Sequence, residues 1–276
     1  MNDISATALT TLKCHDMDAK SEHPILGDLS AGKVLEHIRT NYRVLGNDSD
    51  PKKSLVTHIA LRAKYYDSVV REFIEKHPRA TVVNIGCGLD NRFSRIDNGA
   101  VAFYDLDLPD IINIKKEILR ENNRYHHISG SVFETGWINK IDSDQPVLFL
   151  AEGVFMYCKE EDVKHLFHEL IEKFENFDFL FEVFNSKWLN GWRRKVVEKK
   201  LSKELNFGSG AMFQFGIRDS NALEAWNPKL KLIKDWSYLD TNHPSIGPIR
   251  YFRTFESIRK MQWSVYYQCA CVQPFL

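Results

Sequence analysis

The sequence lacks the features that mark membrane, secreted and nucleic-acid-binding proteins. Its 37 lysine and arginine residues balance 37 aspartate and glutamate residues, and no long basic run is present. We therefore expect neither duplex nucleic acid nor an anionic membrane as its main partner. No apolar run is long enough to cross a bilayer, and the first residues do not resemble a secretory signal peptide. These absences predict a cytoplasmic protein.

Cysteine is also scarce, and its spacing does not indicate disulfides or a zinc site. The five cysteines are odd in number and none forms a C-x-x-C pair, so we expect reduced thiols. The 276 residues are 43% hydrophobic and 27% charged, which is typical of a globular chain with a sizeable core.

Several catalytic and metal-binding motifs are missing too. There is no G-x-S-x-G nucleophile elbow and no G-x-x-x-x-G-K-[ST] phosphate loop. His165 and His168 stand three residues apart on a predicted helix, but no acid or cysteine cluster accompanies them. His126 and His127 alternate in a predicted strand and cannot both face one ion. We therefore expect no metal.

What the sequence does contain is a strand, a glycine turn and a second strand that ends in acids. The apolar run Thr81–Ile85 suits a buried parallel strand. Gly86 and Gly88, on either side of Cys87, allow a sharp turn and leave no Cβ between main chain and ligand. Residues 89–96 can start a helix with Asp90 near its first turn, where an acid is favoured. The small size of Cys87 explains its place better than nucleophilic catalysis does.

Asp105 and Asp107 lie at the end of the second strand, Val101–Leu106. Asp105 follows Gly86 by 19 residues, close to the ~20 at which an acid binds the ribose of a nucleotide. The third glycine of the dinucleotide fingerprint is replaced by Asn91. S-adenosylmethionine (SAM) fits this pattern, because it carries a ribose but no phosphate. The alternatives are a nicotinamide oxidoreductase, which the missing glycine disfavours, and a turn that binds nothing.

The rest of the chain repeats strand and helix, which predicts an α/β fold. We expect a Rossmann-like, doubly wound, seven-stranded sheet whose last strand is antiparallel, in a single domain spanning residues 1–276. Residues 1–78 form a helical N-terminal lid region in this interpretation, and residues 185–228 form a second, inserted lid. The remaining predicted strands and helices are 31–42, 55–76, 110–121, 125–130, 146–154, 160–174, 177–184, 186–206, 230–238, 254–261 and 263–272.

Two charged residues stand out from these elements. Glu152 ends the apolar strand 146–154 and would face a ligand crevice, although it could equally be a structural carboxylate. Arg62 lies inside the helix 55–76, where it is either a surface charge or a fork that holds a carboxylate.

Taken together, five segments resemble the leucine carboxyl methyltransferase family, and in particular its bacterial branch of polyketide O-methyltransferases. They are VVNIGCGLDNRF (82–93), YDLDLP (104–109), ISGSVFETGWI (128–138), PVLFLAEGVFMY (146–157) and FQFGIRDSNALEAW (213–226). The resemblance implies methyl transfer from SAM on a Rossmann-like sheet.

The resemblance also implies roles for individual residues. It assigns Arg62 to the methionine carboxylate of SAM and Gly86 to its methionine part. Asp107 or Asp105 would bind the ribose, and Glu152 the ammonium group or nearby backbone. Ser131 and Val132 would lie beside the adenine. The predicted cofactor-binding set also includes Cys87, Gly88, Leu106 and Gly153.

The methyl acceptor implied by the resemblance is a small molecule, such as a polyketide-like metabolite with a carboxylate or hydroxyl oxygen. Tyr157, in the loop after the fourth strand, is our candidate for orienting that oxygen. One alternative acceptor is a protein C-terminus, although the N-terminal lysine motif of the eukaryotic members is not evident in residues 1–50. The other alternative is a binding protein that has lost turnover. We further expect Arg62→Ala to weaken SAM binding while leaving the fold intact.

Overall fold

A computed structural model of the chain describes residues 3–42, 50–142, 144–189, 191, 194–195 and 213–270. Its helices and strands are, in order, α1 (Asp3–Ala19), α2 (Ser30–Asn41), α3 (Lys53–Lys76), β1 (Thr81–Ile85), α4 (Arg92–Ile96), β2 (Ala102–Asp107), α5 (Pro109–Ile118), β3 (Tyr125–Ser129), β4 (Val147–Ala151), α6 (Glu160–Lys173), β5 (Phe177–Phe184), β6 (Leu230–Trp236), α8 (Glu256–Arg259) and β7 (Gln262–Cys269). Short 3₁₀ helices lie in several of the connections. Among the described helices, none combines the length and the apolar composition needed to cross a membrane.

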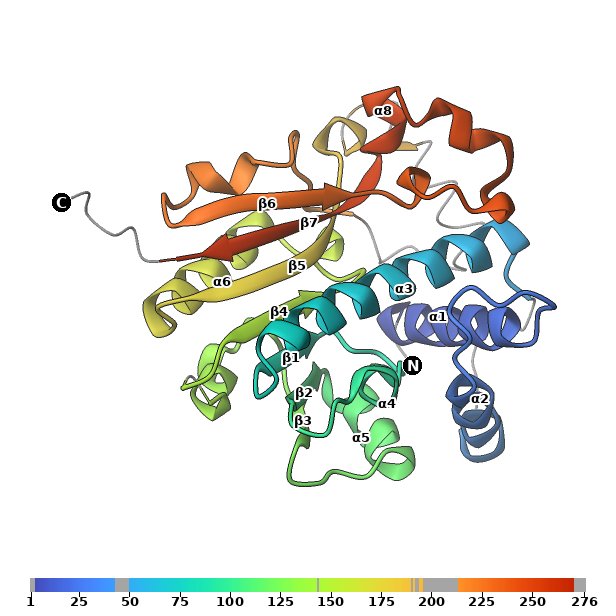
Figure 1. Cartoon of the computed structure of the whole chain (residues 1–276), viewed down its shortest axis with the longest axis horizontal. Coiled ribbons are helices and arrows are strands. Elements are labelled where there is room, and N and C mark those ends of the chain that lie inside the picture. Colours follow the sequence, from blue (N-terminus) through green and yellow to red (C-terminus); the bar gives the residue numbers. More distant parts are fainter. Residues whose placement is uncertain are drawn as a thin grey trace.

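The strands form one sheet in the order β3-β2-β1-β4-β5-β7-β6 (Figure 1). The pairs from β3 to β5 are parallel, whereas β7 lies antiparallel to both β5 and β6. This confirms the predicted doubly wound sheet of seven strands. The chain order reverses between β1 and β4, and in such sheets a ligand crevice forms at the carboxyl ends of the strands beside this point.

The central strands are buried because both faces of the sheet are covered. Every residue of β1 and β4 is buried, as their uninterrupted apolar runs predict. Side chains alternate between the faces: Val83 and Phe149 join a core with α6, while Val82 and Leu148 join a core with α3 and α4.

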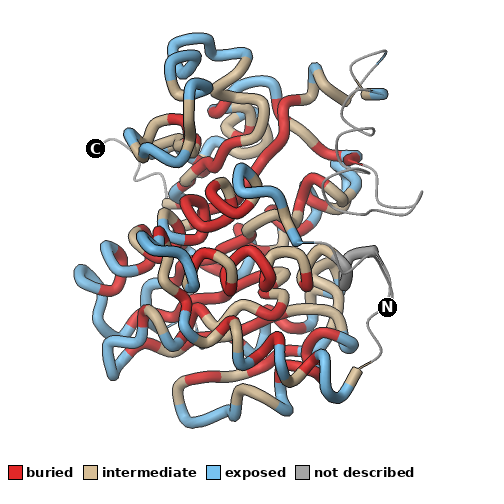
Figure 2. The backbone as a smooth tube through the Cα atoms, turned by 90° about the vertical axis from the view of Figure 1, so that its right-hand side faces the viewer, coloured by how far each residue is buried: buried red, intermediate tan, exposed pale blue. Residues whose placement is uncertain are grey.

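The helices form layers on the two sides of this sheet. Figure 1 shows α3 crossing in front of the strands and α6 behind them. In Figure 2 the buried residues lie mainly in the middle of the molecule, and the exposed residues lie mainly in the turns and loops at the periphery. The helices α1 and α2 pack near the carboxyl ends of the strands, where α1 contacts both α2 and α3. Whether residues 1–78 and 185–228 act as lids stays a prediction.

One helix was missed by the sequence analysis. Residues 1–50 are weakly patterned, yet residues 3–19 form α1. The reason is that α1 buries polar as well as apolar side chains, among them His15, Asp16 and Asp18. A helix that packs through polar side chains does not show the apolar period by which helices are recognised.

Other boundaries differ from the predictions. The helix expected over 89–96 begins only at Arg92, with Asn91 as its N-cap, so Asp90 lies just before its first turn. The helix expected over 254–261 is reduced to α8, and the last strand ends at Cys269. The long helix predicted over 186–206 falls largely outside the described residues. Of those that are described, Ser186–Trp188 form a 3₁₀ turn and residues 191, 194 and 195 are helical.

Candidate active site

A cavity of about 630 Å³ lies at the carboxyl ends of β1 to β4, with α1 and α3 contributing further walls. It contains eleven of the twelve predicted site residues, namely Arg62, Gly86, Cys87, Gly88, Leu106, Asp107, Ser131, Val132, Glu152, Gly153 and Tyr157. The twelfth, Asp105, is not among the lining residues. Segments that are far apart in the sequence thus converge on one space.

The glycine turn forms the floor of this cavity. Gly86 and Gly88 have φ of +61° and +55°, a left-handed conformation that costs other residues energy. The amides of Gly86 and Cys87 both donate to the carbonyl of Leu106, at 2.8 and 3.2 Å, and so join the turn to β2. Burial raises the pKa of the Cys87 thiol well above its usual range. Cys87 is therefore a protonated wall residue and not a thiolate nucleophile.

The two acids of β2 have different surroundings. Asp107 lines the cavity, and its two carboxylate oxygens accept from the amides of Gly88 and Leu108, each at 2.7 Å. Burial raises its pKa above the ordinary value despite these donors. Each oxygen retains a lone pair for a hydroxyl group of a ligand.

Asp105 points into the protein and is 1% exposed. It forms an ion pair of 2.7 Å with Lys115 and accepts from Asn84 at 2.9 Å and from Tyr125 at 2.5 Å. Because Lys115 is also 1% exposed, the pair is a buried structural link between α5 and the sheet. Of the two acids that the spacing left open for a ribose, the structure puts only Asp107 in the cavity.

The loop after β3 supplies another wall of the cavity. Gly130, Ser131, Val132 and Phe133 line the cavity. The Ser131 hydroxyl accepts from the amide of Phe133 at 3.3 Å, and the indole of Trp137 donates to the carbonyl of Val132 at 2.8 Å. These bonds hold the loop in place, so its side chains can lie against a planar ring.

A buried network of charges surrounds Arg62. Its Nε donates to Glu152 at 2.8 Å and its Nη1 donates to Glu182 at 2.7 Å. Arg92 donates to Glu152 from the other side. Burial alone would raise the pKa of Glu152, but Arg92 and Arg62 hold it below its ordinary value. Glu152 is therefore ionised, and it is both a structural partner and a cavity residue.

Arg62 keeps one nitrogen for a ligand. Its described contacts use Nε and Nη1, whereas Nη2 lies 3.5 Å from the position that a Cβ on Gly153 would take. Gly153 has φ of +72°, so this turn both requires glycine and lets a ligand approach the guanidinium. The structure changes what we expect of Arg62→Ala: because Arg62 is 7% exposed and neutralises two buried acids, this variant should also lose stability.

Sequence reasoning missed most of this network. It consists of three guanidinium and five carboxylate groups, those of Arg62, Arg92, Arg95, Asp28, Asp67, Asp90, Glu152 and Glu182. One signal was available: Glu182 interrupts the apolar run FDFLFEVF of β5. A charge at a buried strand position needs a partner, but nothing in the sequence says which.

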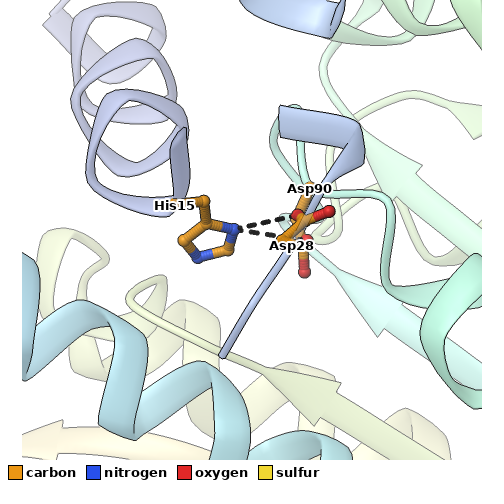
Figure 3. A group of neighbouring side chains, drawn as sticks. All are labelled: His15, Asp28 and Asp90. Atoms are coloured by element: carbon orange, nitrogen blue, oxygen red, sulfur yellow. Dashed lines mark hydrogen bonds and ion pairs between the residues drawn. The ribbon is translucent and has the colours of Figure 1, made fainter. Parts of the chain in front are cut away.

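The N-terminal helix is attached to the glycine turn at the edge of this network. Figure 3 shows His15 of α1 directed at Asp28 and Asp90, with Nδ1 at 3.3 and 3.7 Å from their carboxylate oxygens. The three ligand atoms lie close enough to share a metal ion. However, Arg95 already donates to both carboxylates, at 2.9 Å to Asp28 and 2.6 Å to Asp90. The cluster therefore acts as a polar link, in which the hydrogen bond between His15 and Asp28 holds α1 over the cavity.

Another part of the cavity lining is an apolar and aromatic cluster, formed by Met156, Phe184, Phe213, Tyr157 and Met261. The ring of Tyr157 lies 5.1 Å from that of Phe213. Burial raises the pKa of Tyr157 above its usual range, so the phenol is protonated at neutral pH. Further apolar side chains of the lining are Leu55, Ile59, Ile249 and Ile258.

Replacing Gly86 by alanine tests the floor of the cavity. A Cβ at Gly86 would collide with Val154, and φ there is +61°. We expect Gly86→Ala to lower the free energy of unfolding by about 1–3 kcal/mol. Because the floor of the cavity would shift, we also expect SAM to bind at least about tenfold more weakly, a loss of the size caused by removing one charged hydrogen bond. Urea unfolding and titration calorimetry measure the two effects.

Gly99→Ala is the matched control for this variant. Gly99 has φ of +81°, but nothing lies within 4 Å of a Cβ there. Gly99→Ala should lower the free energy of unfolding by a similar amount, about 1–2 kcal/mol, and leave the affinity for SAM unchanged. Equal losses of affinity in both variants would show that the floor of the cavity is not a binding surface.

The ion pairs of Asp90 predict a dependence of stability on pH. Burial opposes ionisation, but Arg95 and Arg92 hold the pKa of Asp90 far below its ordinary value. Its contribution is therefore complete above about pH 4, the unfolded pKa, and is lost as the pH falls through the lowered, folded pKa. We expect Asp90→Asn to cost about 1–3 kcal/mol at neutral pH and progressively less below about pH 4.

Urea unfolding of the wild type and of Asp90→Asn over a pH series gives this difference directly. A difference that stayed constant into strong acid would show that Asp90 is not held ionised by the arginines.

Solved structures of other proteins share this architecture. A DUF574 family protein from Streptomyces avermitilis superposes with a TM-score of 0.58 at 10% identity, over 94% of this chain and 96% of that one. Magnesium protoporphyrin IX methyltransferase from Synechocystis, solved with S-adenosylhomocysteine, gives 0.50 at 12% identity over 88% and 97%. The fold is the Rossmann-like fold of class I SAM-dependent methyltransferases.

The sequence comparisons identify one family within this class. Residues 17–171 match the leucine carboxyl methyltransferase family, and the chain belongs to this family. The tetracenomycin polyketide synthesis O-methyltransferase TcmP of Streptomyces glaucescens is 27% identical over 87% of this chain and 85% of its own length. A SAM-dependent methyltransferase of Gibberella zeae is 26% identical over 62% of this chain and 61% of its own. The protein is a SAM-dependent methyltransferase, as predicted.

Proposed function

We propose that this enzyme transfers a methyl group from SAM to an oxygen of a small, largely apolar acceptor of the polyketide type. The observation that carries the proposal is the mixed lining of the cavity: charged residues and glycine-rich loops share it with an apolar and aromatic cluster. Its volume of about 630 Å³ lies within the ~300–1,000 Å³ of small-molecule sites.

The polar residues of the lining suit each part of SAM. Asp107 offers free lone pairs to the ribose hydroxyls, and Arg62 offers Nη2 to the methionine carboxylate. The ionised Glu152 suits the ammonium group. The wall of Ser131 and Val132 suits the adenine ring.

The charge of the network supports the same ligand. Five carboxylates surround three guanidinium groups, and burial raises the pKa of Glu182 above its ordinary value. Even if Glu182 is protonated, the remaining carboxylates exceed the guanidinium groups. A ligand with two cationic groups and one carboxylate would offset this buried excess of negative charge.

Methyl transfer from SAM depends more on aligning the acceptor oxygen with the methyl group than on acid–base catalysis. Bound SAM supplies a sulfonium methyl group that an acceptor oxygen can attack in line, with the sulfur leaving as a neutral thioether. The apolar wall excludes water, and the Phe213 contact holds Tyr157 in place to orient the acceptor. Because its phenol stays protonated, Tyr157 can donate a hydrogen bond but does not act as a base. A carboxylate acceptor would need no base.

The relatives favour a small acceptor but leave a second candidate. TcmP is named for polyketide O-methylation, whereas the family is named for leucine carboxyl methylation. A protein C-terminal carboxylate is therefore the alternative acceptor. A SAM-binding protein without turnover is the alternative to an active enzyme.

Methyl-labelled SAM incubated with the enzyme and a cell lysate separates these candidates. We expect the label in the small-molecule fraction extracted into organic solvent. Label in precipitated protein that mild alkali releases would identify a carboxyl methyl ester on protein. Tight binding of SAM in calorimetry, with no label in either fraction, would identify a SAM-binding protein without turnover. Binding of NAD in place of SAM would overturn the proposal.

A further inference from the structure

The exposed apolar side chains of the described residues are concentrated in one short segment. Four of the six large ones lie within seven residues, namely Ile249 at 42% exposure, Tyr251 at 70%, Phe252 at 48% and Phe255 at 57%. All residues from 251 to 257 are exposed. We call residues 249–255 the aromatic rim. Exposed aromatic residues this close together mark an interaction site.

The rim is held in a defined shape. The 3₁₀ helix Pro244–Phe252 carries most of it, and the amide of Phe255 donates to the carbonyl of Phe252 at 3.0 Å. The rings of Phe252 and Phe255 lie 6.1 Å apart. The Arg250 guanidinium lies 5.0 Å from the centre of the Tyr251 ring. The aromatic side chains are thus presented together.

The rim continues into the cavity. Ile249 is exposed and also lines the cavity. Ile258 and Met261, which follow the rim in the sequence and are half-buried, line it too. An apolar path therefore leads from the outer surface to the cavity. A lipophilic molecule could follow this path without its apolar surface being returned to water.

The charges of the rim are weakly basic. Within the described residues, Arg250 and Arg253 have no acidic partner at ion-pair distance, while Glu256 pairs with Lys260 at 3.4 Å. Aromatic rings next to arginine are the composition that settles at the boundary between lipid headgroups and acyl chains. The near-zero charge of the whole chain argues against strong electrostatic adsorption, so the rings would carry the contact.

We infer that the aromatic rim docks transiently on a lipid surface, from which the acceptor enters the cavity. A lipid surface fits better than a protein partner because the rim is small: a stable protein interface needs about 800 Å² from each partner, and here only four large apolar side chains are exposed. The docking itself is independent of the proposed function. Only the delivery of a lipophilic acceptor rests on it.

The test is co-sedimentation of the full chain with vesicles of phosphatidylcholine, and with vesicles of phosphatidylcholine and phosphatidylglycerol in equal amounts. We expect the wild type to bind both, and the second more tightly. The triple variant Tyr251→Ser, Phe252→Ser, Phe255→Ser should bind at least about tenfold more weakly, because three exposed rings no longer enter the interface. Its thermal unfolding and SAM affinity should be unchanged, since these side chains are exposed and do not line the cavity.

The matched control removes exposed apolar side chains elsewhere. Leu29 and Ile233 are 80% and 52% exposed and lie outside the rim, so Leu29→Ser combined with Ile233→Ser should bind vesicles like the wild type. Absence of wild-type binding to either vesicle, or equal binding by the triple variant, would overturn the inference. So would self-association in the ultracentrifuge that disappears in the triple variant without vesicle binding, because the rim would then serve a second copy of the chain. SAM affinity, measured in the same preparations, reports separately on the proposed function.

Discussion

Asp105→Asn is expected to lower the free energy of unfolding by about 3–5 kcal/mol and to leave the SAM affinity of the folded protein little changed. The reason is that Lys115, at 1% exposure, would lose the carboxylate that neutralises it at 2.7 Å. Asp105 itself does not line the cavity. Urea unfolding measures the first effect, and calorimetry below the unfolding transition measures the second.

Asp107→Asn should show the opposite pattern. The carboxylate accepts from two backbone amides and faces the cavity. An amide side chain keeps one acceptor oxygen and turns an NH₂ group toward the other donor or the ligand. We expect a roughly 10- to 100-fold loss of SAM affinity and a smaller loss of stability than in Asp105→Asn.

Both variants replace an aspartate by asparagine, at positions two residues apart, so each serves as the control for the other. If Asp105→Asn weakened SAM binding more than Asp107→Asn at equal folded fraction, the assignment of the ribose to Asp107 would fail.

The second large effect is expected for substitutions of Arg62, which should lower both the free energy of unfolding and the affinity for SAM. Arg62→Ala leaves Glu182 buried without its guanidinium partner and should cost about 3–5 kcal/mol. This variant alone therefore cannot isolate binding. Arg62→Lys retains the positive charge but loses the planar fork that reaches Glu152, Glu182 and a ligand together. We expect it to fold and to bind SAM about tenfold or more weakly.

Arg95→Lys is the matched control, because Arg95 belongs to the same network but does not line the cavity. It should lose comparable stability and keep its SAM affinity. The same measurements apply, namely urea unfolding and calorimetric titration of SAM. Equal affinity of the wild type and Arg62→Lys would remove Arg62 from the binding site.

Much of the fold could be predicted because its signals are local. The apolar runs of β1 and β4 are continuous, since each strand is covered on both faces. The turn from Gly86 to Gly88 needs positive φ at both glycines, so its conformation is dictated by residues within the turn. The helix α1 could not be predicted in this way, because its buried side chains include His15, Asp16 and Asp18, which interrupt the apolar period of a helix.

The choice between Asp105 and Asp107 shows where local reasoning stops. Both residues lie on the same side of β2, because side chains alternate with a period of two. In the sheet, however, Asp105 pairs in register with Asn84 inside β1, whereas Asp107 lies one position beyond Leu106, which pairs with Ile85 at the end of β1. Asp107 therefore reaches the crevice and Asp105 does not.

The sequence by itself determined the order of strands and helices, the glycine turn and the set of residues at the strand ends. Each of these depends on neighbours within a few positions along the chain. Only the tertiary structure decided which of the charged groups meet. Arg62 lies 90 residues from Glu152 and 120 from Glu182, and a buried charge must be neutralised by whichever group the packing of the whole chain brings beside it.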